Sequence, residues 1–356
     1  MHNQLALTRR TFLGAALATP FISRTAFGQS NAEIIQANFG GGVAQEFDAA
    51  YGKPFTVETG IPFRIVEVPS TETALISNTA APQHNSSYHS YSGAMRLHGL
   101  GITDALAIDD FPVLNSIPRE YWPMIDDKHV AGIPVHFCHY GIAYNSDEAK
   151  ATDFKSWTSL TDGRWKDRVT VTRPVFASLY DVPWYSRLVA GNQTKVDAGI
   201  QRYLDVTRNS LTTYSSMAQN HQLLQRGEAV ASAYYSDRIW SAKREGTANL
   251  DMTIPEEGAL MIPYVMVIPK NCPHPEAARK FANYAGGARP AERAIEGTGC
   301  LPLNSEAKVD DELVRSRLGN SMAEIRARLF NPDWKQIQLQ RDGLIERLEK
   351  EVAALK

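Results

Sequence analysis

The sequence has few cysteines and carries none of the short motifs that mark common catalytic or nucleotide-binding sites. Three cysteines occur among 356 residues, and none lies in a CxxC pair or at a spacing typical of zinc ligands. The GxSxG, HExxH, CxxCH and GxGxxG patterns are also absent, which disfavours the corresponding classes of enzyme. Internal repeats are lacking too, and this disfavours a structural repeat protein.

The charge and hydropathy patterns indicate neither a basic stripe nor a membrane span. Beyond the first 29 residues, 34 lysines and arginines stand against 39 aspartates and glutamates, a net charge near −5. A mildly acidic chain of this kind argues against a nucleic-acid partner. After residue 29, no apolar run approaches the roughly 20 residues that a membrane-spanning helix needs.

The first 29 residues predict export. Arg9 and Arg10 precede an apolar run over residues 14–22, and small residues then lead to a polar start at Gln29, which is the pattern of an export signal. The paired arginine favours the twin-arginine route for folded proteins, and a general secretory signal with an accidental second arginine is the alternative. We therefore expect residues 1–29 to be a twin-arginine signal peptide.

The length and the order of segments predict a two-lobed α/β protein. About 327 residues follow the signal, which exceeds the size at which a single core stops growing. Short apolar strands alternate with helical stretches, as in proteins whose sheets are covered by helices on both faces. Three extended apolar segments, 132–145, 259–270 and 301–304, are interpreted as crossings between the lobes, and central strands of one sheet are the alternative. The expected lobes are residues 30–137 with 259–304 and residues 138–258 with 305–356.

The three cysteines allow two interpretations in an oxidising compartment. Cys272 and Cys300 flank one helical segment and are the favoured pair if a disulfide forms. The main alternative is that all three, including Cys138, are small buried apolar residues. His136, Cys138 and His139 could suggest metal ligands, but on a strand His136 and Cys138 share one face while His139 points away, which favours core packing.

Several short segments follow one another in an order that characterises a known family. They are residues 38–42, 55–61, 141–145, 156–162, 257–259, 267–270 and 273–281. In this order they resemble the periplasmic solute-binding proteins of ABC importers, in the group that includes spermidine/putrescine, thiamine and ferric-iron receptors. The resemblance covers nearly the whole chain after the signal.

The resemblance implies a type II periplasmic-binding-protein fold, in which two α/β lobes joined by a multi-strand hinge enclose a ligand cleft. It also implies a monomeric receptor in the periplasm, which binds a small-molecule solute and delivers it to an ABC permease and ATPase complex in the inner membrane. Neither enzymatic activity nor a cofactor is expected. An enzyme exported in its folded state is the alternative from another class.

The first candidate ligand-binding residues lie in loops after expected strands. Phe39, Gly41 and Gly42 stand in a glycine-rich loop before a helix, where backbone N–H groups can approach a ligand; a simple tight turn is the alternative. In relatives, the loop at the place of Tyr91 and Ser92 offers hydroxyls and an aromatic ring to the solute.

The remaining candidates indicate a cleft less negative than that of a polyamine receptor. Arg173 stands where polyamine receptors carry acidic residues, and its guanidinium group suits a carboxylate or phosphate; a structural salt bridge is the alternative. Tyr264 replaces an aspartate of those receptors, and Tyr234, Tyr235 and Asp237 follow a strand at another ligand-binding position. We expect a small organic solute of the amine, amino-acid-like or acid-bearing kind, and an acidic group on it is favoured.

The adjacent tyrosines leave a ferric-iron receptor as an alternative. Ferric receptors carry neighbouring tyrosines at the place of Tyr234 and Tyr235, and phenolate is a hard oxygen donor that suits Fe³⁺. An iron site needs further oxygen or imidazole ligands, and no convincing His or Glu partner stands near the first strands. The sequence therefore predicts no metal site as its main interpretation.

Overall fold

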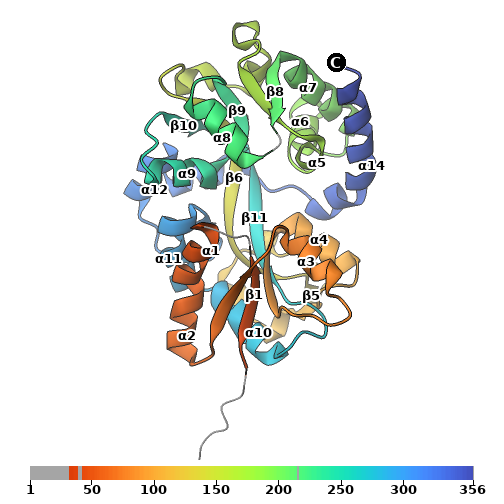
Figure 1. Cartoon of the computed structure of the whole chain (residues 1–356), viewed down its shortest axis with the longest axis vertical. Helices are drawn as coiled ribbons and strands as arrows, with labels where there is room; N and C mark the ends of the chain where they lie inside the picture. Colours follow the sequence, from red (N-terminus) through yellow and green to blue (C-terminus); the bar gives the residue numbers. More distant parts are fainter. Residues whose placement is uncertain (1–31, 39–41, 215, 356) are drawn as a thin grey trace, which may run out of the picture. The chain divides into compact units, whose positions relative to one another are not determined.

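The computed structural model describes residues 32–38, 42–214 and 216–355 (Figure 1). The predicted signal peptide and the candidate residues Phe39 and Gly41 lie outside the described residues. From Ala32 onward, the contacts within the chain unite it into one compact unit. Among the described helices, none has both the length and the apolar character that a bilayer crossing requires.

One mixed sheet forms the centre of the fold, which confirms the predicted α/β class. Its strands are β1 (Ile34–Asn38), β2 (Phe63–Glu67), β3 (Ser86–Ser90), β6 (Ile133–Asn145), β7 (Val169–Thr172), β8 (Ser210–Tyr214), β9 (Ala231–Tyr235), β10 (Leu250–Thr253), β11 (Ala259–Val267), β12 (Leu301–Pro302) and β13 (Leu329–Phe330). Their order is β2–β1–β3–β11–β6–β9–β7–β8, with β10 and β12 paired to β6 and β13 paired to β11. The short strands β4 (Leu106–Ala107) and β5 (His129–Val130) pair separately.

Strand directions change from the ends of the sheet to its middle. At one end β1 pairs in parallel with β2 and β3, and at the other end β7 pairs in parallel with β8 and β9. In the middle, β11 is antiparallel to β3 and β6, and β6 is antiparallel to β9. Parallel pairs need helical crossovers, so the helices gather around the two ends of the sheet.

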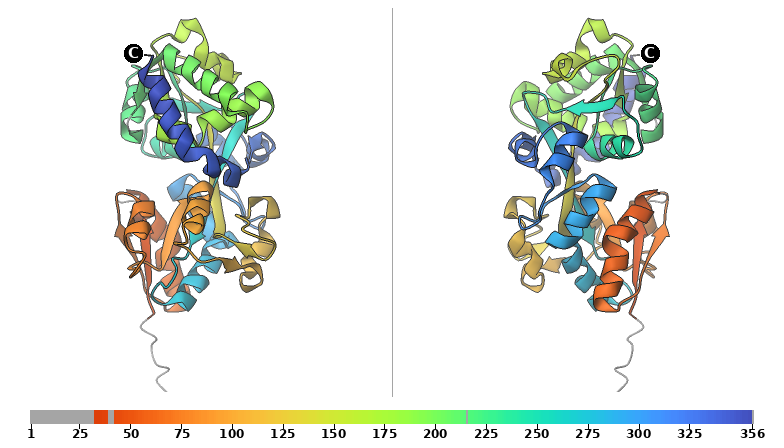
Figure 2. Two further views of the ribbon diagram at one scale, coloured as in Figure 1. Left: turned by 90° about the vertical axis from the view of Figure 1, so that its right-hand side faces the viewer. Right: turned by 90° about the vertical axis from the view of Figure 1, so that its left-hand side faces the viewer.

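Helices flank the sheet on both sides in the views of Figures 1 and 2. The α-helices are α1 (Gly42–Phe47), α2 (Lys53–Thr59), α3 (Thr71–Ser77), α4 (Tyr91–Gly99), α5 (Pro174–Ala177), α6 (Asp181–Ala190), α7 (Val196–Asn209), α8 (Met217–Gln225), α9 (Ser236–Arg244), α10 (Pro275–Ala285), α11 (Ala288–Thr298), α12 (Asp311–Leu318), α13 (Met322–Ala327) and α14 (Trp334–Ala353). The last of them, α14, is rich in charged residues. It contacts α4 as well as α5 and α7.

The three extended segments noted in the sequence lie together in the middle of the sheet. They contain β6, β11 and β12, and both other strands pair with β6. All 13 residues of β6 are buried, because elements cover both of its faces, and this explains why its sequence is almost continuously apolar instead of alternating. Figure 1 shows β6 and β11 extending from one group of helices to the other. The lobe boundaries given above stay a prediction.

The three cysteines are buried as free thiols, in agreement with the second of the two interpretations given above. Cys138, Cys272 and Cys300 are all buried and free. The structure therefore does not contain the Cys272–Cys300 disulfide, and the thiols pack as small side chains in the core.

Candidate functional site

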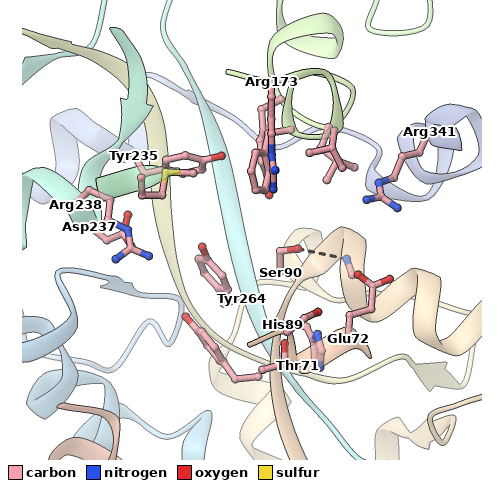
Figure 3. Close-up of a pocket in the computed structure, with 18 of the residues that line it drawn as sticks. Thr71, Glu72, His89, Ser90, Arg173, Tyr235, Asp237, Arg238, Tyr264 and Arg341 are labelled. Carbon is pink, nitrogen blue, oxygen red and sulfur yellow. Dashed lines mark hydrogen bonds and ion pairs between the residues drawn. The ribbon is translucent and has the colours of Figure 1, made fainter. Parts of the chain in front are cut away.

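A cavity of about 460 Å³ lies beside the middle of the sheet (Figure 3). Its walls come from the start of α3, the turn from β3 to α4, the segment around α5, the turn from β9 to α9, and β11. Turns at the ends of strands place their side chains in a crevice of an α/β fold, where ligands commonly bind. The lining residues are Pro69, Ser70, Thr71, Glu72, Tyr88, His89, Ser90, Gly93, Arg173, Val175, Phe176, Leu179, Tyr180, Met217, Tyr235, Asp237, Arg238, Tyr264 and Arg341.

Four tyrosines line the cavity. The ring of Tyr88 stacks on that of Tyr264, with centroids 4.8 Å apart and planes at 11°. Tyr180 meets Tyr235 edge to face at 5.6 Å. Burial raises the pKa of all four phenols, so they are neutral hydroxyl groups near pH 7. The wall thus offers apolar faces together with hydrogen-bonding hydroxyls.

Both carboxylates of the cavity already have a basic partner. Glu72 forms an ion pair with Arg96, and Asp237 lies 3.8 Å from Nε of Arg238. Burial raises the pKa of Asp237, and the neighbouring Arg238 opposes that shift. Oδ1 of Asp237 is buried and has no hydrogen-bond partner in the described part of the chain, so it is an acceptor that a solute can use.

Two further arginines line the cavity, and neither forms a salt bridge with a buried carboxylate among the residues that the structure describes. Arg173 precedes α5 and lies over the ring of Phe176, with Cζ 5.0 Å from its centroid. Arg341 comes from α14, its Nε is buried without a hydrogen-bond partner, and its nearest carboxylate, the exposed Asp342, is 3.7 Å away. Figure 3 shows both arginines facing the open space between the surrounding elements.

The histidine of the cavity adds no charge. His89 is buried, and its Nε2 lies 2.8 Å from Oγ of Ser87. Burial lowers the pKa of His89 to about 3, so the ring is neutral near pH 7. The positively charged side chains that line the cavity are therefore arginines alone.

Four of the residues predicted from the sequence come together at this cavity. Arg173, Tyr235, Asp237 and Tyr264 all line it, although 91 residues of sequence separate the first from the last. Strand β9 ends at Tyr235, and α9 begins directly after it, which brings Asp237 to the same edge.

Other predicted residues lie elsewhere. The hydroxyl of Tyr91 donates to the carbonyl of Trp122 at 2.6 Å, and Tyr91 lines a different cavity. Ser92 is buried and bonds Oγ of Ser90 at 3.2 Å. Gly42 begins the six-residue helix α1.

The adjacent tyrosines do not act as a pair. Tyr235 lines the cavity, whereas the hydroxyl of Tyr234 donates to the carbonyl of Met217 at 3.0 Å, and Tyr234 lines a neighbouring cavity. Successive residues of a strand point to opposite faces. In the described ranges, no group of three His, Cys, Asp or Glu residues could hold a metal ion. The geometry gives no support to the ferric-iron alternative.

Sequence reasoning missed several lining residues. Tyr88 and Ser90 lie at the end of β3, shortly before the predicted Tyr91 and Ser92, so the predicted loop borders the cavity. Arg341 carried no such signal. It lies far along the chain on a charged amphipathic helix, where arginines are common on the solvent face.

Comparisons with known proteins agree with this fold. The family model of the bacterial extracellular solute-binding protein matches residues 50–317. A spermidine/putrescine-binding periplasmic protein of Haemophilus influenzae is 24% identical over 265 residues, which are 71% of each chain.

Solved structures show the same fold. An ABC transporter substrate-binding protein of Bradyrhizobium japonicum has a TM-score of 0.74 and 18% identity, over 91% of this chain and 99% of that one. A periplasmic binding protein of Agrobacterium tumefaciens in complex with agropinic acid has a TM-score of 0.69 and 18% identity, over 90% and 99%. As its resemblance to receptors of ABC importers predicts, the chain belongs to the family of bacterial extracellular solute-binding proteins.

Proposed function

We propose that this protein is the periplasmic substrate-binding component of an ABC importer and that it captures a small organic solute carrying an acidic group. Membership of the solute-binding family supports the general function. The proposal includes export by the twin-arginine route, a monomeric receptor without a cofactor, closure of two lobes over the solute, and delivery to a permease and ATPase complex.

The charged side chains of the cavity favour an acidic solute. Glu72 and Asp237 each lie beside an arginine. Among the described residues, Arg173 forms no ion pair, and Arg341 has only the exposed Asp342 at 3.7 Å, while its Nε is buried without a hydrogen-bond partner. A guanidinium group binds a carboxylate or phosphate through charge-assisted hydrogen bonds, each worth about 1.5–3 kcal/mol. A polyamine would bring more positive charge to this place.

The opposite side of the cavity favours an amino-acid-like solute within this class. Oδ1 of Asp237 has no described partner, and Figure 3 places Asp237 across the cavity from Arg341. Tyr264 and Tyr235 lie between them, where their rings would pack against the apolar part of a solute. An ammonium group near Asp237 and an acidic group near Arg341 would use all of these features.

The named ligands of relatives are compatible with both chemistries. The Haemophilus relative is named for spermidine and putrescine, and one structural relative holds agropinic acid. Arg173 and Tyr264 stand where polyamine receptors carry acidic residues. This replacement supports an acid-bearing solute for this chain.

Calorimetry and thermal-shift measurements with γ-aminobutyrate, dicarboxylates, sugar phosphates, putrescine and spermidine test this proposal. An acid-bearing solute at about 100 times its Kd should stabilise the protein by roughly 2.7 kcal/mol. Arg341→Gln and Arg173→Gln should each weaken its binding about 10- to 100-fold. Arg208→Gln is the control, since Arg208 is exposed and pairs with Asp205 away from the cavity. Micromolar binding of spermidine or putrescine, with no response to any acid, would contradict the proposal.

A further inference from the structure

Cys138 and Cys300 occupy opposite positions on two neighbouring strands. Strand β12 pairs antiparallel with β6, and its register sets Pro302 opposite His136 and Leu301 opposite Phe137. Continued by one residue, the same register places Cys300 opposite Cys138. Directly opposed residues of antiparallel strands have Cα atoms about 4.5 or 5.5 Å apart, which lies within the range of about 4.4–6.8 Å found in disulfides.

The two thiols share their surroundings. Both side chains are buried, and opposed residues of a ladder project from the same face of the sheet. Sγ of Cys138 lies 4.0 Å from the hydroxyl of Tyr264. Burial and then the carboxylate of Asp237 raise the pKa of both thiols, and Cys300 raises that of Cys138 further. Each thiol is therefore close to the same aspartate, Asp237, which lines the cavity.

The backbone before Cys300 is held in place. Gly299 has a φ of +66°, and a Cβ at this position would lie 2.5 Å from Cβ of Trp240. The amide of Cys300 donates to Oγ1 of Thr298 at 3.2 Å. This tight turn ends α11 and directs the chain into β12, which fixes the position of Cys300 relative to β6.

Cys272 lies in a different environment. It precedes α10, and the carboxylate that raises its pKa after burial is that of Asp104. The groups around Cys300 are instead Asp237 and Tyr88. The sequence spacing that favours Cys272 and Cys300 as partners therefore has no counterpart in the fold.

We propose that Cys138 and Cys300 are placed to form a disulfide during oxidative folding, when a disulfide-bearing oxidant is supplied. With glutathione disulfide, one cysteine thiolate attacks a sulfur and releases one glutathione thiol. The other cysteine thiolate then attacks the mixed disulfide, forms the Cys138–Cys300 bond and releases the second glutathione thiol. Two electrons pass from the cysteines to the oxidant, and their two protons end on the released thiols.

Refolding in a glutathione redox buffer, followed by thiol titration in denaturant and peptide mapping, tests the pair. Refolding is required because both thiols are buried in the native state. Of the three thiols, only that of Cys272 should remain titratable. The intact mass should fall by about 2 Da, and the map should show a peptide linking Cys138 to Cys300.

Two variants provide the controls. Cys272→Ser should keep the link and leave no titratable thiol, whereas Cys138→Ser should abolish the link. Three free thiols in refolded chain with native circular dichroism, or a link that contains Cys272, would overturn the proposal. The peptide map of the unaltered chain decides the matter even if Cys138→Ser fails to fold. No solute enters the measurement, so its result is independent of the function proposed above.

Discussion

The hydroxyl of Tyr51 lies 2.8 Å from Nδ1 of His136, in the interior beside the cavity. The hydroxyl of Tyr88 bonds the other ring nitrogen, Nε2, and the ring of Tyr88 stacks on Tyr264 in the cavity wall. Burial lowers the pKa of His136 to about 3, so its imidazole is neutral and has one donor and one acceptor. One tyrosine therefore donates a hydrogen bond to the imidazole and the other accepts one. These two hydrogen bonds hold Tyr88 in its position.

Removing the hydroxyl of Tyr88 should destabilise the protein. Tyr88→Phe leaves Nε2 of the buried His136 without a partner, which should lower the free energy of unfolding by about 1–3 kcal/mol. Urea denaturation at pH 7 measures the change. Tyr284→Phe is the matched control, because the hydroxyl of Tyr284 pairs with surface groups, Glu58 and Arg293. Equal losses in the two variants would argue against the buried network.

A methyl group added at Gly299 should lower the free energy of unfolding more than one added at Gly319. Both glycines end helices with a positive φ, +66° and +76°, which costs an alanine roughly 1–2 kcal/mol. At Gly299 the new Cβ would also lie 2.5 Å from Cβ of Trp240, whereas at Gly319 nothing lies within 4 Å. Urea denaturation should show a larger loss for Gly299→Ala, and a loss no greater than that of Gly319→Ala would contradict the close packing.

The fold was predictable because its signals are local. The apolar run that became β6 and the alternation of strands and helices could be read directly from the sequence, since burial on both faces requires apolar side chains at every position. The order of strands is different. That β11 lies between β3 and β6 depends on pairings between distant residues, which no local pattern specifies.

The candidate site also contains residues that the local sequence predicts and others that it does not. Tyr235 is the last residue of β9 and Asp237 lies two residues further on, so their place at the end of a strand could be predicted. The alternation of side chains then decides that Tyr235 lines the cavity while Tyr234 faces Met217. Arg341 reaches the cavity only because α14 packs against α4 and α5, and this tertiary contact leaves no trace in the helical pattern.

Two tyrosines predicted together from the sequence should differ in their effect on solute binding. Tyr235→Ala removes an aromatic ring from the cavity wall and should weaken binding of the solute identified by calorimetry at least about tenfold, or 1.4 kcal/mol. Tyr91→Phe should leave the affinity unchanged, since the Tyr91 hydroxyl bonds the carbonyl of Trp122 instead. Titration calorimetry on both variants makes the comparison. Loss of affinity in Tyr91→Phe would place the solute nearer to α4 than the cavity described here.

The buried carboxyl group of Asp181 should make stability depend on pH. Asp181 is fully buried, and it accepts hydrogen bonds from Thr172 at 2.6 Å and from Tyr140 at 3.2 Å. Burial raises its pKa from 3.8 to about 6, although these hydrogen bonds oppose the shift. The folded state therefore binds this proton more tightly than the unfolded state does.

Consequently, the contribution of Asp181 to the free energy of unfolding is most favourable below about pH 4. It is lost as the pH rises through about 6. The loss should approach roughly 3 kcal/mol, from about two pKa units at 1.36 kcal/mol each. Asp181→Asn should remove this dependence, so that the stability of the variant relative to the original chain rises between pH 4 and 7 in urea denaturation. Asp126→Asn provides a control of opposite sign, because hydrogen bonding from the Lys128 amide lowers the pKa of Asp126. If the Asp181→Asn difference stayed constant across this range, the carboxyl group would be ionised in the fold at no extra cost, and its burial would have to be compensated by groups other than Thr172 and Tyr140.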